Sequence, residues 1–129
     1  MDYFGDLLTI EASGCNIEAI NDVKTVYNFM VKAVEVAEMK IIQGPVVFPY
    51  THPIDSLEDG ISGNLILADS HGAFHSFIND GYAFFDIFSC KPFNRSALKK
   101  LFVETFQPKK IKTSVKKRGK GYKRSFNMI

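Results

Sequence analysis

The sequence contains little cysteine, with only two such residues in a chain of 129. Cys15 and Cys90 lie far apart and outside any metal-ligand spacing such as Cys-x-x-Cys. A disulfide framework and a structural zinc site are therefore not indicated. At least one of the two cysteines could instead serve as a working thiol.

Long apolar runs are also missing from the chain. No stretch reaches the roughly 18 apolar residues that a membrane-spanning helix needs. The amino end lacks the basic segment, apolar core and small-residue cleavage site that together mark a secreted protein. These absences predict a soluble cytoplasmic protein without a membrane association.

Acidic residues are absent from the end of the chain. Residues 109–129 carry 9 Lys and Arg and no acid, whereas residues 1–108 carry 7 Lys and Arg against 14 Asp and Glu. The net charge of +2 is therefore the sum of an acidic segment, residues 1–108, and a basic tail, residues 109–129. Residues 116–129 of this tail could be flexible.

The length and composition indicate one domain, residues 1–129. A chain of this size can bury a modest core but is too short for two independent domains. Hydrophobic residues make up 46% and charged residues 23% of the chain, as in ordinary globular proteins. We find no internal repeat.

Apolar periodicity predicts two helices. Apolar residues recur every three or four positions from Ile17 to Met39, which indicates a helix with one buried face and an amino-terminal cap at Asn16 or Asn21. The same period in Arg95–Phe106 predicts a second helix, which Pro108 ends.

Six segments read as strands. The first is expected around Leu7–Glu11 and ends at Gly14. The others are KIIQGPVVF, interrupted by Gly-Pro, then ISGNLILA, GAFHSF, GYAFFDIFSC and a basic terminal strand, KKIKTSVKKRG. This order predicts an α+β fold, in which an antiparallel β-sheet carries two helices packed on one face.

Reactive side chains gather where one predicted strand runs into a turn. The stretch NLILADSHGAFHSF carries Asp69, Ser70 and His71 after an apolar run, with His75 five residues after the serine. Taken singly, such residues are typical of turns and of hydrogen-bonded filling. A cysteine such as Cys90 is typically a small buried hydrophobe.

Two conventional sites are conceivable. Ser70 or Cys90 could be a nucleophile with His75 as its base, but no Gly-x-Ser-x-Gly elbow surrounds the serine. His52, His71 and His75 could hold a metal, but no carboxylate stands at a suitable helical register. We therefore expect no metal in the site.

A longer stretch carries a more specific pattern. The segment GISGNLILADSHGAFHSFINDGYAFFDIFSC resembles the processing region of the small bacterial and archaeal S-adenosylmethionine decarboxylases, which are pyruvoyl-dependent enzymes made as proenzymes. The resemblance extends more faintly to EASGCNIEAINDV and KKRG. The positions at the family's spacings are Ser62, Ser70, His75, Gly81, Tyr82, Ala83, Asp86 and Cys90.

The resemblance implies that the chain cuts itself into a β chain, 1–69, and an α chain, 70–129. The Ser70 hydroxyl would attack the carbonyl of Asp69 and turn the amide into an ester, assisted by Ser62. His75 would then remove the α-proton of Ser70, so that the carboxylate of Asp69 leaves. The dehydroalanine left behind would hydrolyse to ammonia and a pyruvoyl group.

The pyruvoyl group would be the built-in cofactor. Its ketone would form a Schiff base with the substrate's α-amine and accept the electrons freed by loss of carbon dioxide. Cys90 would return the proton, a task that suits a thiol because its ordinary pKa of about 8.5 leaves it mostly protonated at neutral pH. The implied product is decarboxylated S-adenosylmethionine, the aminopropyl donor of spermidine and other polyamine synthesis. A dimer through the open sheet face or edges is implied as well.

The sequence departs from the family's pattern at several positions near the site. Asp69 replaces the usual glutamate, Gly72 an aliphatic residue and Asn79 an acid. The family's loop before the first serine carries an aromatic residue after its histidine, whereas here Pro53 follows the histidine. Phe48 or Tyr50 could substitute for that aromatic.

The same loop leaves the substrate open within the family. Some relatives act on L-arginine or L-ornithine, and Asp55, Glu58 and Asp59 would suit such a cation, although they are also typical of a solvated turn. S-adenosylmethionine is the family's default substrate, and its sulfonium is cationic too.

Two other functions compete with an active decarboxylase. The basic tail, with Tyr122 and Phe126 as stacking residues, could bind nucleic acid. Its lysines alternate along a strand-like segment, which a solvated edge strand explains more simply. A homologue that folds without processing itself, and that acts as a binding or regulatory partner, is the third possibility.

Overall fold

Strands and helices follow one another along the chain in nearly the predicted order. The computed structural model describes residues 2–122. Its elements are β1 (Gly5–Ser13), α1 (Ile17–Ile20), α2 (Val23–Val36), β2 (Ile41–Tyr50), the 3₁₀ turn η1 (Ser56–Glu58), β3 (Gly60–Leu67), β4 (Ser70–Phe77), β5 (Tyr82–Ser89), α3 (Arg95–Phe106) and β6 (Lys110–Arg118).

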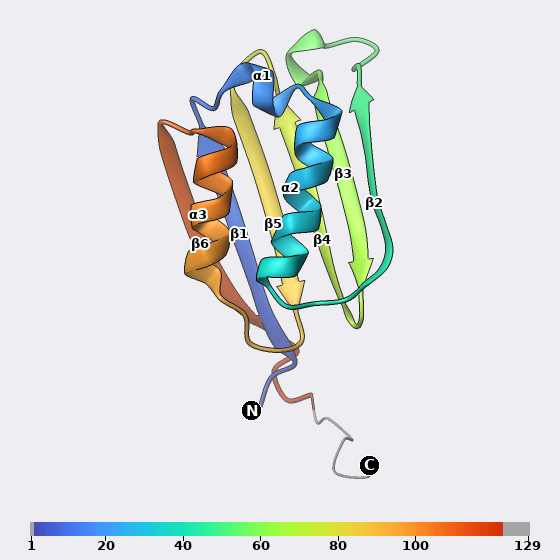
Figure 1. Ribbon diagram of the computed structural model, residues 1–129, viewed down its shortest axis with the longest axis vertical. Coiled ribbons are helices and arrows are strands. Elements are labelled where there is room, and N and C mark those ends of the chain that lie inside the picture. The colour runs from blue at the N-terminus through green and yellow to red at the C-terminus, as the bar shows by residue number, and fades with distance from the viewer. Residues whose placement is uncertain (1, 123–129) are drawn as a thin grey trace.

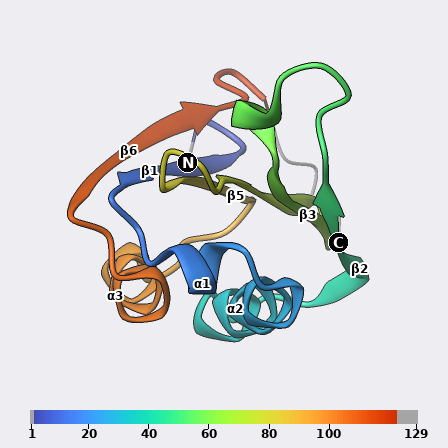
Figure 2. The same cartoon turned by 90° about the horizontal axis from the view of Figure 1, so that it is seen from above.

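The six strands form one sheet in the order β2-β3-β4-β5-β1-β6, and every neighbouring pair is antiparallel. The helices α1, α2 and α3 all lie on one side of this sheet (Figures 1 and 2). The predicted α+β class is therefore confirmed. We call the side of the sheet without helices the open face.

The core lies between the sheet and the helices. Side chains along β3 and β4 alternate between this core and the open face, as expected for strands with one buried side. Phe29 of α2 is 1% exposed and forms ring contacts with Phe74 of β4, Phe85 of β5 and the α3 residues Phe102 and Phe106. These contacts join two strands and a second helix around one side chain.

The helix predicted from Ile17 to Met39 is split in two, so the structure has three α-helices instead of two. Asn16 caps α1, as one of the two predicted caps, but Asn21 is its carboxy-terminal cap. Asp22 then caps α2 by accepting a bond from the backbone N–H of Thr25. Short polar side chains bond to nearby backbone groups in this way and compete with a continuous helix.

Glycine marks the end of the first strand, as predicted. Strand β1 is longer than expected but stops at Ser13, and Gly14 follows with a φ of 65°, a left-handed value that glycine adopts easily. The Gly-Pro interruption predicted in β2 coincides with shifts in its pairing to β3 between Ile41 and Val46.

The basic segment forms an edge strand, as the sequence predicts. Strand β6 pairs with β1 from Lys110 through Arg118, so residues 116–118 belong to the sheet. Residues 123–129 of the tail, including Phe126, lie outside the described residues. No helix among residues 2–122 is long and apolar enough to cross a membrane.

Candidate active site

A two-residue loop, Ala68 and Asp69, joins β3 to β4. Leu67 pairs with Ser70 across this hairpin, so Ser70 is the first residue of the new strand. Asp69 has a φ of 56°, in the left-handed region that costs an L-residue roughly 1–2 kcal/mol. Aspartate is several-fold enriched among the non-glycine residues found there, which explains how the loop tolerates it.

Ser70 and Cys90 lie together beside this loop. Ser70 is 5% exposed, and its Oγ accepts a hydrogen bond of 3.0 Å from the backbone N–H of Cys90, which directly follows β5. The Sγ of Cys90 is 3.7 Å from the carbonyl oxygen of Ala68. One residue therefore holds the Ser70 hydroxyl with its backbone and places its thiol against the loop.

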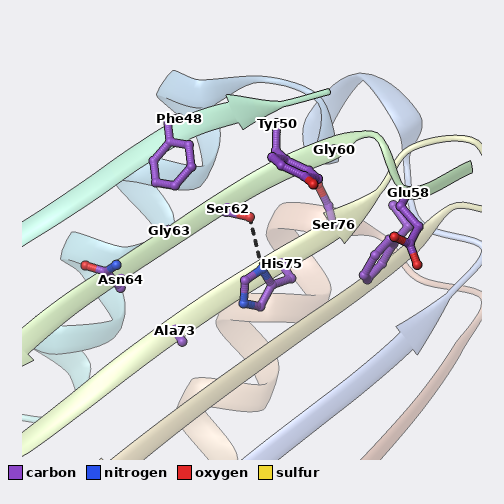
Figure 3. Close-up of a pocket in the computed structure, with 11 residues that line it drawn as sticks. Phe48, Tyr50, Glu58, Gly60, Ser62, Gly63, Asn64, Ala73, His75 and Ser76 are labelled. Carbon is purple, nitrogen blue, oxygen red and sulfur yellow. Dashed lines mark hydrogen bonds between the residues drawn. The ribbon is translucent and has the colours of Figure 1, made fainter. Parts of the chain in front are cut away.

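Ser62 and His75 form a second pair. They are direct partners across β3 and β4, and the Ser62 Oγ is 3.0 Å from His75 Nδ1 (Figure 3). Both lie on the open face, because their neighbours along each strand point into the core. His75 is exposed and Ser62 half-buried, so this pair can be reached from outside the chain.

The two pairs are separated along β4. Ser70 begins the strand and His75 comes five residues later. An extended strand advances about 3.3 Å per residue, so the two residues lie on the order of 16 Å apart. His75 cannot reach Ser70 or Cys90 within one chain, and a conventional triad of these residues is therefore absent.

Asp86 lies between the two histidines of the open face. It pairs with Ala73 across β4 and β5, with His71 and His75 on either side of that alanine. Burial raises the pKa of Asp86, while His75 and His71 act in the opposite direction and Glu11 adds to the rise. The sequence marked Asp86 as a matching position but indicated no such environment.

A cavity of about 700 Å³ opens beside Ser62 and His75 (Figure 3). Phe48 and Tyr50 come from β2, Glu58 comes from η1, and the rest of the lining comes from β3 and β4. The lining residues are Phe48, Tyr50, Glu58, Gly60, Ser62, Gly63, Asn64, Ala73, His75, Ser76 and Phe77.

His52 organises the loop between β2 and β3. Its Nδ1 accepts hydrogen bonds from the backbone N–H groups of Ile54 and Asp55, at 3.2 and 2.8 Å. Its Nε2 lies 3.2 Å from Oε2 of Glu58, and its backbone N–H donates to Asp59 at 2.7 Å. The histidine thus serves the loop and does not join His71 and His75.

The structure does not support the metal interpretation. Within residues 2–122, no three His, Cys, Asp or Glu side chains are grouped so that they could hold a metal ion. His71 instead lies near the ring of Phe88, with ring centroids 5.6 Å apart.

Comparison with known proteins places this arrangement in a family. The family model described as S-adenosylmethionine decarboxylase matches residues 6–119, which is most of the chain. The chain belongs to this family. The family resemblance seen in the sequence is therefore confirmed.

Similar decarboxylase proenzymes come from both bacteria and archaea. The S-adenosylmethionine decarboxylase proenzyme of Moorella thermoacetica is 36% identical over 90 residues, which cover 70% of this chain and 66% of that protein. That of Clostridium botulinum is 30% identical over 93% of this chain and 98% of its own length. That of Pyrococcus furiosus is 31% identical over 70% and 60%, respectively. The matches to Moorella and Pyrococcus thus span less than two thirds of those relatives.

Solved structures support the family's fold. The adenosylmethionine decarboxylase of Aquifex aeolicus superposes with a TM-score of 0.72 at 21% identity, covering 97% of this chain and 98% of that one. The Trypanosoma brucei AdoMetDC monomer gives a TM-score of 0.54 at 14% identity, covering 85% of this chain and 45% of that one.

The departures from the decarboxylase pattern have visible places in the fold. Asp69 occupies the left-handed position of the hairpin loop, where aspartate is found more often than most other non-glycine residues. Asn79 donates its side-chain N–H to the carbonyl of Ser56 and so ties the β4–β5 turn to η1. Phe48 and Tyr50 both line the cavity, where the sequence required a substitute aromatic.

Sequence reasoning missed several lining residues. Asn64, Ala73 and Phe77 share the open face with Ser62 and His75, and each lies two residues from one of them on the same strand. Strict alternation along β3 and β4 was the signal that would have found them. The contact between His52 and Glu58 left no such signal, since it depends on the fold of a loop.

Proposed function

We propose that the chain is a self-processing, pyruvoyl-dependent S-adenosylmethionine decarboxylase that supplies the aminopropyl donor for polyamine synthesis. Cleavage between Asp69 and Ser70 would give chains 1–69 and 70–129. The observation that carries this proposal is the hairpin loop, where the Ser70 hydroxyl is held at a left-handed Asp69 with a thiol beside it.

The hairpin supports the first step of processing. The Ser70 Oγ attacks the carbonyl carbon of Asp69, its proton leaves, and the C–N bond breaks to give an ester and a free amine. An ester is less stable than an amide, so the loop must favour attack. The left-handed φ of Asp69 costs roughly 1–2 kcal/mol, which this rearrangement can release.

The second step belongs to His75 in this proposal. A base takes the α-proton of Ser70, and the Asp69 carboxylate then leaves with the ester oxygen. Loss of ammonia from the resulting dehydroalanine, with uptake of water, leaves a pyruvoyl group at residue 70. Ser62 orients the histidine, because its hydroxyl lies 3.0 Å from Nδ1 and so constrains the ring.

The residues around Ser70 fit a pyruvoyl group. Residue 70 begins a strand beside a cysteine whose thiol is already at the loop. When formed, the group supplies an electron sink for the electrons released on loss of carbon dioxide. Cys90 is the proton donor in turnover in this proposal, because its thiol lies 3.7 Å from the Ala68 carbonyl of the loop and a thiol can give up a proton.

A complete site requires two copies of the chain. His75 stands on the order of 16 Å from Ser70 along one strand, too far for proton transfer. A second copy, related by a two-fold axis parallel to the open face, can bring its Ser62 and His75 to the Ser70 and Cys90 of the first. The symmetry then creates two identical sites.

The open face has the surface that such a dimer needs. Large apolar side chains are exposed there, including Val46 at 49%, Ile66 at 46% and Phe48 at 44%. Exposed apolar side chains gathered on one face mark an interaction surface. A homodimer that packs open face to open face covers them and encloses the two cavities.

A mixed dimer tests the proposal. A tagged Ser70→Ala copy is co-expressed with an untagged His75→Ala copy, and the tagged protein is purified and weighed by intact mass spectrometry. Neither variant cuts itself when expressed alone. In the mixed dimer, the Ser70 of the untagged copy meets an intact His75, so the untagged chain should be cleaved after Asp69.

Absence of cleavage in the mixed dimer, when the wild type cleaves itself, would contradict the two-copy site. Turnover is tested on the processed wild type by release of carbon dioxide from S-adenosylmethionine, with L-arginine and L-ornithine as rival substrates. Release from neither S-adenosylmethionine nor the two amino acids would contradict the decarboxylase itself.

A further inference from the structure

We propose that the carboxylate of Glu58 determines substrate specificity by binding a positive charge on the substrate. His52 is the positioning residue that holds the Glu58 carboxylate at the cavity. This inference rests on the proposed function, because it takes the cavity beside Ser62 and His75 as the place of the substrate's side chain. Neither Glu58 nor His52 stands at a position of the processing motif.

The cavity has an acidic character that one residue supplies. Among the lining residues within 2–122, Glu58 is the only carboxylate, and none is Lys or Arg. Its other polar groups are neutral hydroxyls and an amide, apart from the imidazole of His75. A carboxylate beside mostly apolar walls is screened less than one in open water, so it favours a cationic ligand.

His52 fixes this carboxylate through its two ring nitrogens. Because Nδ1 accepts from the backbone N–H groups of Ile54 and Asp55, the ring hydrogen lies on Nε2. Nε2 therefore donates to Glu58 at 3.2 Å. This contact holds the Glu58 side chain, which is 55% exposed, against free rotation.

The loop is also anchored at the cavity from both ends. The ring of Tyr50, itself a lining residue, packs edge-on against that of His52, with centroids 6.0 Å apart. Asn79 holds the carbonyl of Ser56 from the β4–β5 turn. The short turn that carries Glu58 is thus fastened to both walls, as a specificity element requires.

The ligand chemistry that follows is an α-amino acid with a fixed positive charge on its side chain. The α-amine of the substrate reacts at residue 70, so Glu58 binds the positive charge at the other end of the substrate. The sulfonium of S-adenosylmethionine, the guanidinium of L-arginine and the ammonium of L-ornithine share this feature. Turnover by the processed enzyme decides which of the three is the substrate.

Binding to the uncleaved chain gives the first test, since the cavity is already present there. In a Ser70→Ala background, dissociation constants are measured by calorimetry for S-adenosylmethionine and for S-adenosylhomocysteine, its neutral thioether counterpart. Glu58→Gln should lower the preference for the sulfonium about tenfold while leaving the thioether's affinity within about twofold, as expected when one partly desolvated charge pair is lost.

Two further variants separate position from charge. His52→Asn keeps an acceptor for the two loop N–H groups but cannot reach Glu58. It should therefore lower the preference for the sulfonium over the thioether by about threefold. Asp55→Asn is the matched control, because it removes the same charge from the same loop outside the cavity and should change neither constant.

Turnover gives the second test. In processed enzyme, Glu58→Gln should raise KM about tenfold for whichever of S-adenosylmethionine, L-arginine or L-ornithine is decarboxylated, with kcat within about twofold. An equal loss of affinity for the sulfonium and the thioether, or an unchanged preference, overturns the inference. A wild type that never cleaves itself overturns the proposed function instead, while the binding comparison still decides the role of Glu58.

Discussion

At the scale of single residues, Cys90 makes two separate contacts, one through its backbone and one through its thiol. Its backbone N–H holds the Ser70 hydroxyl, and its thiol faces the hairpin loop. A substitution that removes only the thiol should therefore separate self-cleavage from turnover. We expect Cys90→Ala to cleave itself as the wild type does but to decarboxylate at least about 100-fold more slowly, since general acid catalysis contributes 10² to 10⁴.

The measurement is intact mass for cleavage and carbon dioxide release for turnover, on the same preparation. Cys15→Ala is the matched control, because Cys15 is buried at a distance from the site and burial raises its pKa to about 11. Full turnover in Cys90→Ala would remove the thiol from the mechanism.

The raised pKa of Asp86 has a consequence for stability. The folded protein keeps the Asp86 proton to a higher pH than the unfolded chain does, because burial disfavours the carboxylate. Stability from this group is therefore present at low pH and is lost as pH rises from about 4 through the raised pKa. Asp86→Asn should remove this loss.

Thermal unfolding of the wild type and Asp86→Asn across this pH range measures the effect. The wild type should fall below the variant as pH rises, whereas the exposed turn variant Asp80→Asn should track the wild type. If the difference in thermal stability between the wild type and Asp86→Asn does not change with pH, or if the wild type gains stability over the variant as pH rises, the assigned environment of Asp86 is contradicted.

The sequence proposes the candidate site residues but does not place them in space. Ser62, Ser70, His75 and Cys90 stand at the family's spacings, so the sequence proposes them as site residues, and their roles stay predictions. Their grouping into two separate pairs follows only once β4 is known to be extended, because a spacing of five residues is short on a helix and long on a strand. The Glu58 position depends on loop contacts that have no periodic signature.

At the scale of elements, Phe29 connects α2 to the sheet and to α3. Its ring contacts residues of β4, β5 and α3 and is 1% exposed. Phe29→Ala should lower the free energy of unfolding by about 3–5 kcal/mol, because it removes apolar contacts and leaves a cavity.

Urea unfolding followed by circular dichroism gives this value, and Phe29→Leu should lose clearly less because it keeps part of the volume. A loss below about 1 kcal/mol in Phe29→Ala would contradict the central place of this ring in the core. Either variant should leave the hairpin loop, which lies outside the core, able to cleave.

Strong apolar periods were the reliable guide to the elements. Helix α3 has the bounds that its period and Pro108 predicted, and β1 ends at the predicted glycine. The break between α1 and α2 was missed, because the apolar period continues through Asn21 and Asp22. The backbone N–H of Asn21 still bonds to the Ile17 carbonyl, but the Asp22 side chain accepts from the backbone N–H of Thr25, and this local bond begins a new helix.

At the scale of the whole molecule, the open face is the expected dimer surface. Ile66→Asp places a charge on this face, where Ile66 is 46% exposed, and should give a monomer in sedimentation equilibrium that no longer cleaves itself. Tyr27→Asp on the helical side, where Tyr27 is 43% exposed, is the matched control and should remain a cleaving dimer. A cleaving monomer from Ile66→Asp would contradict the shared site.

The fold class could be predicted from the order of elements, whereas the assembly could not. Alternation along β3 and β4 implies one buried side and one open side. The sequence does not say what covers the open side, because aromatic and apolar residues such as Phe48 and Ile66 suit a ligand or a second copy equally well. Only the distance between Ser70 and His75 favours the second copy.

Self-cleavage is the central claim, and intact mass spectrometry of the purified wild type under denaturing conditions, beside Ser70→Ala, tests it most directly. The wild type should give two chains split between Asp69 and Ser70, the second beginning with a pyruvoyl group, and the variant should remain whole at 14.5 kDa. A wild type that stays a single 14.5 kDa chain after long incubation would contradict the account and favour a homologue that binds without processing itself.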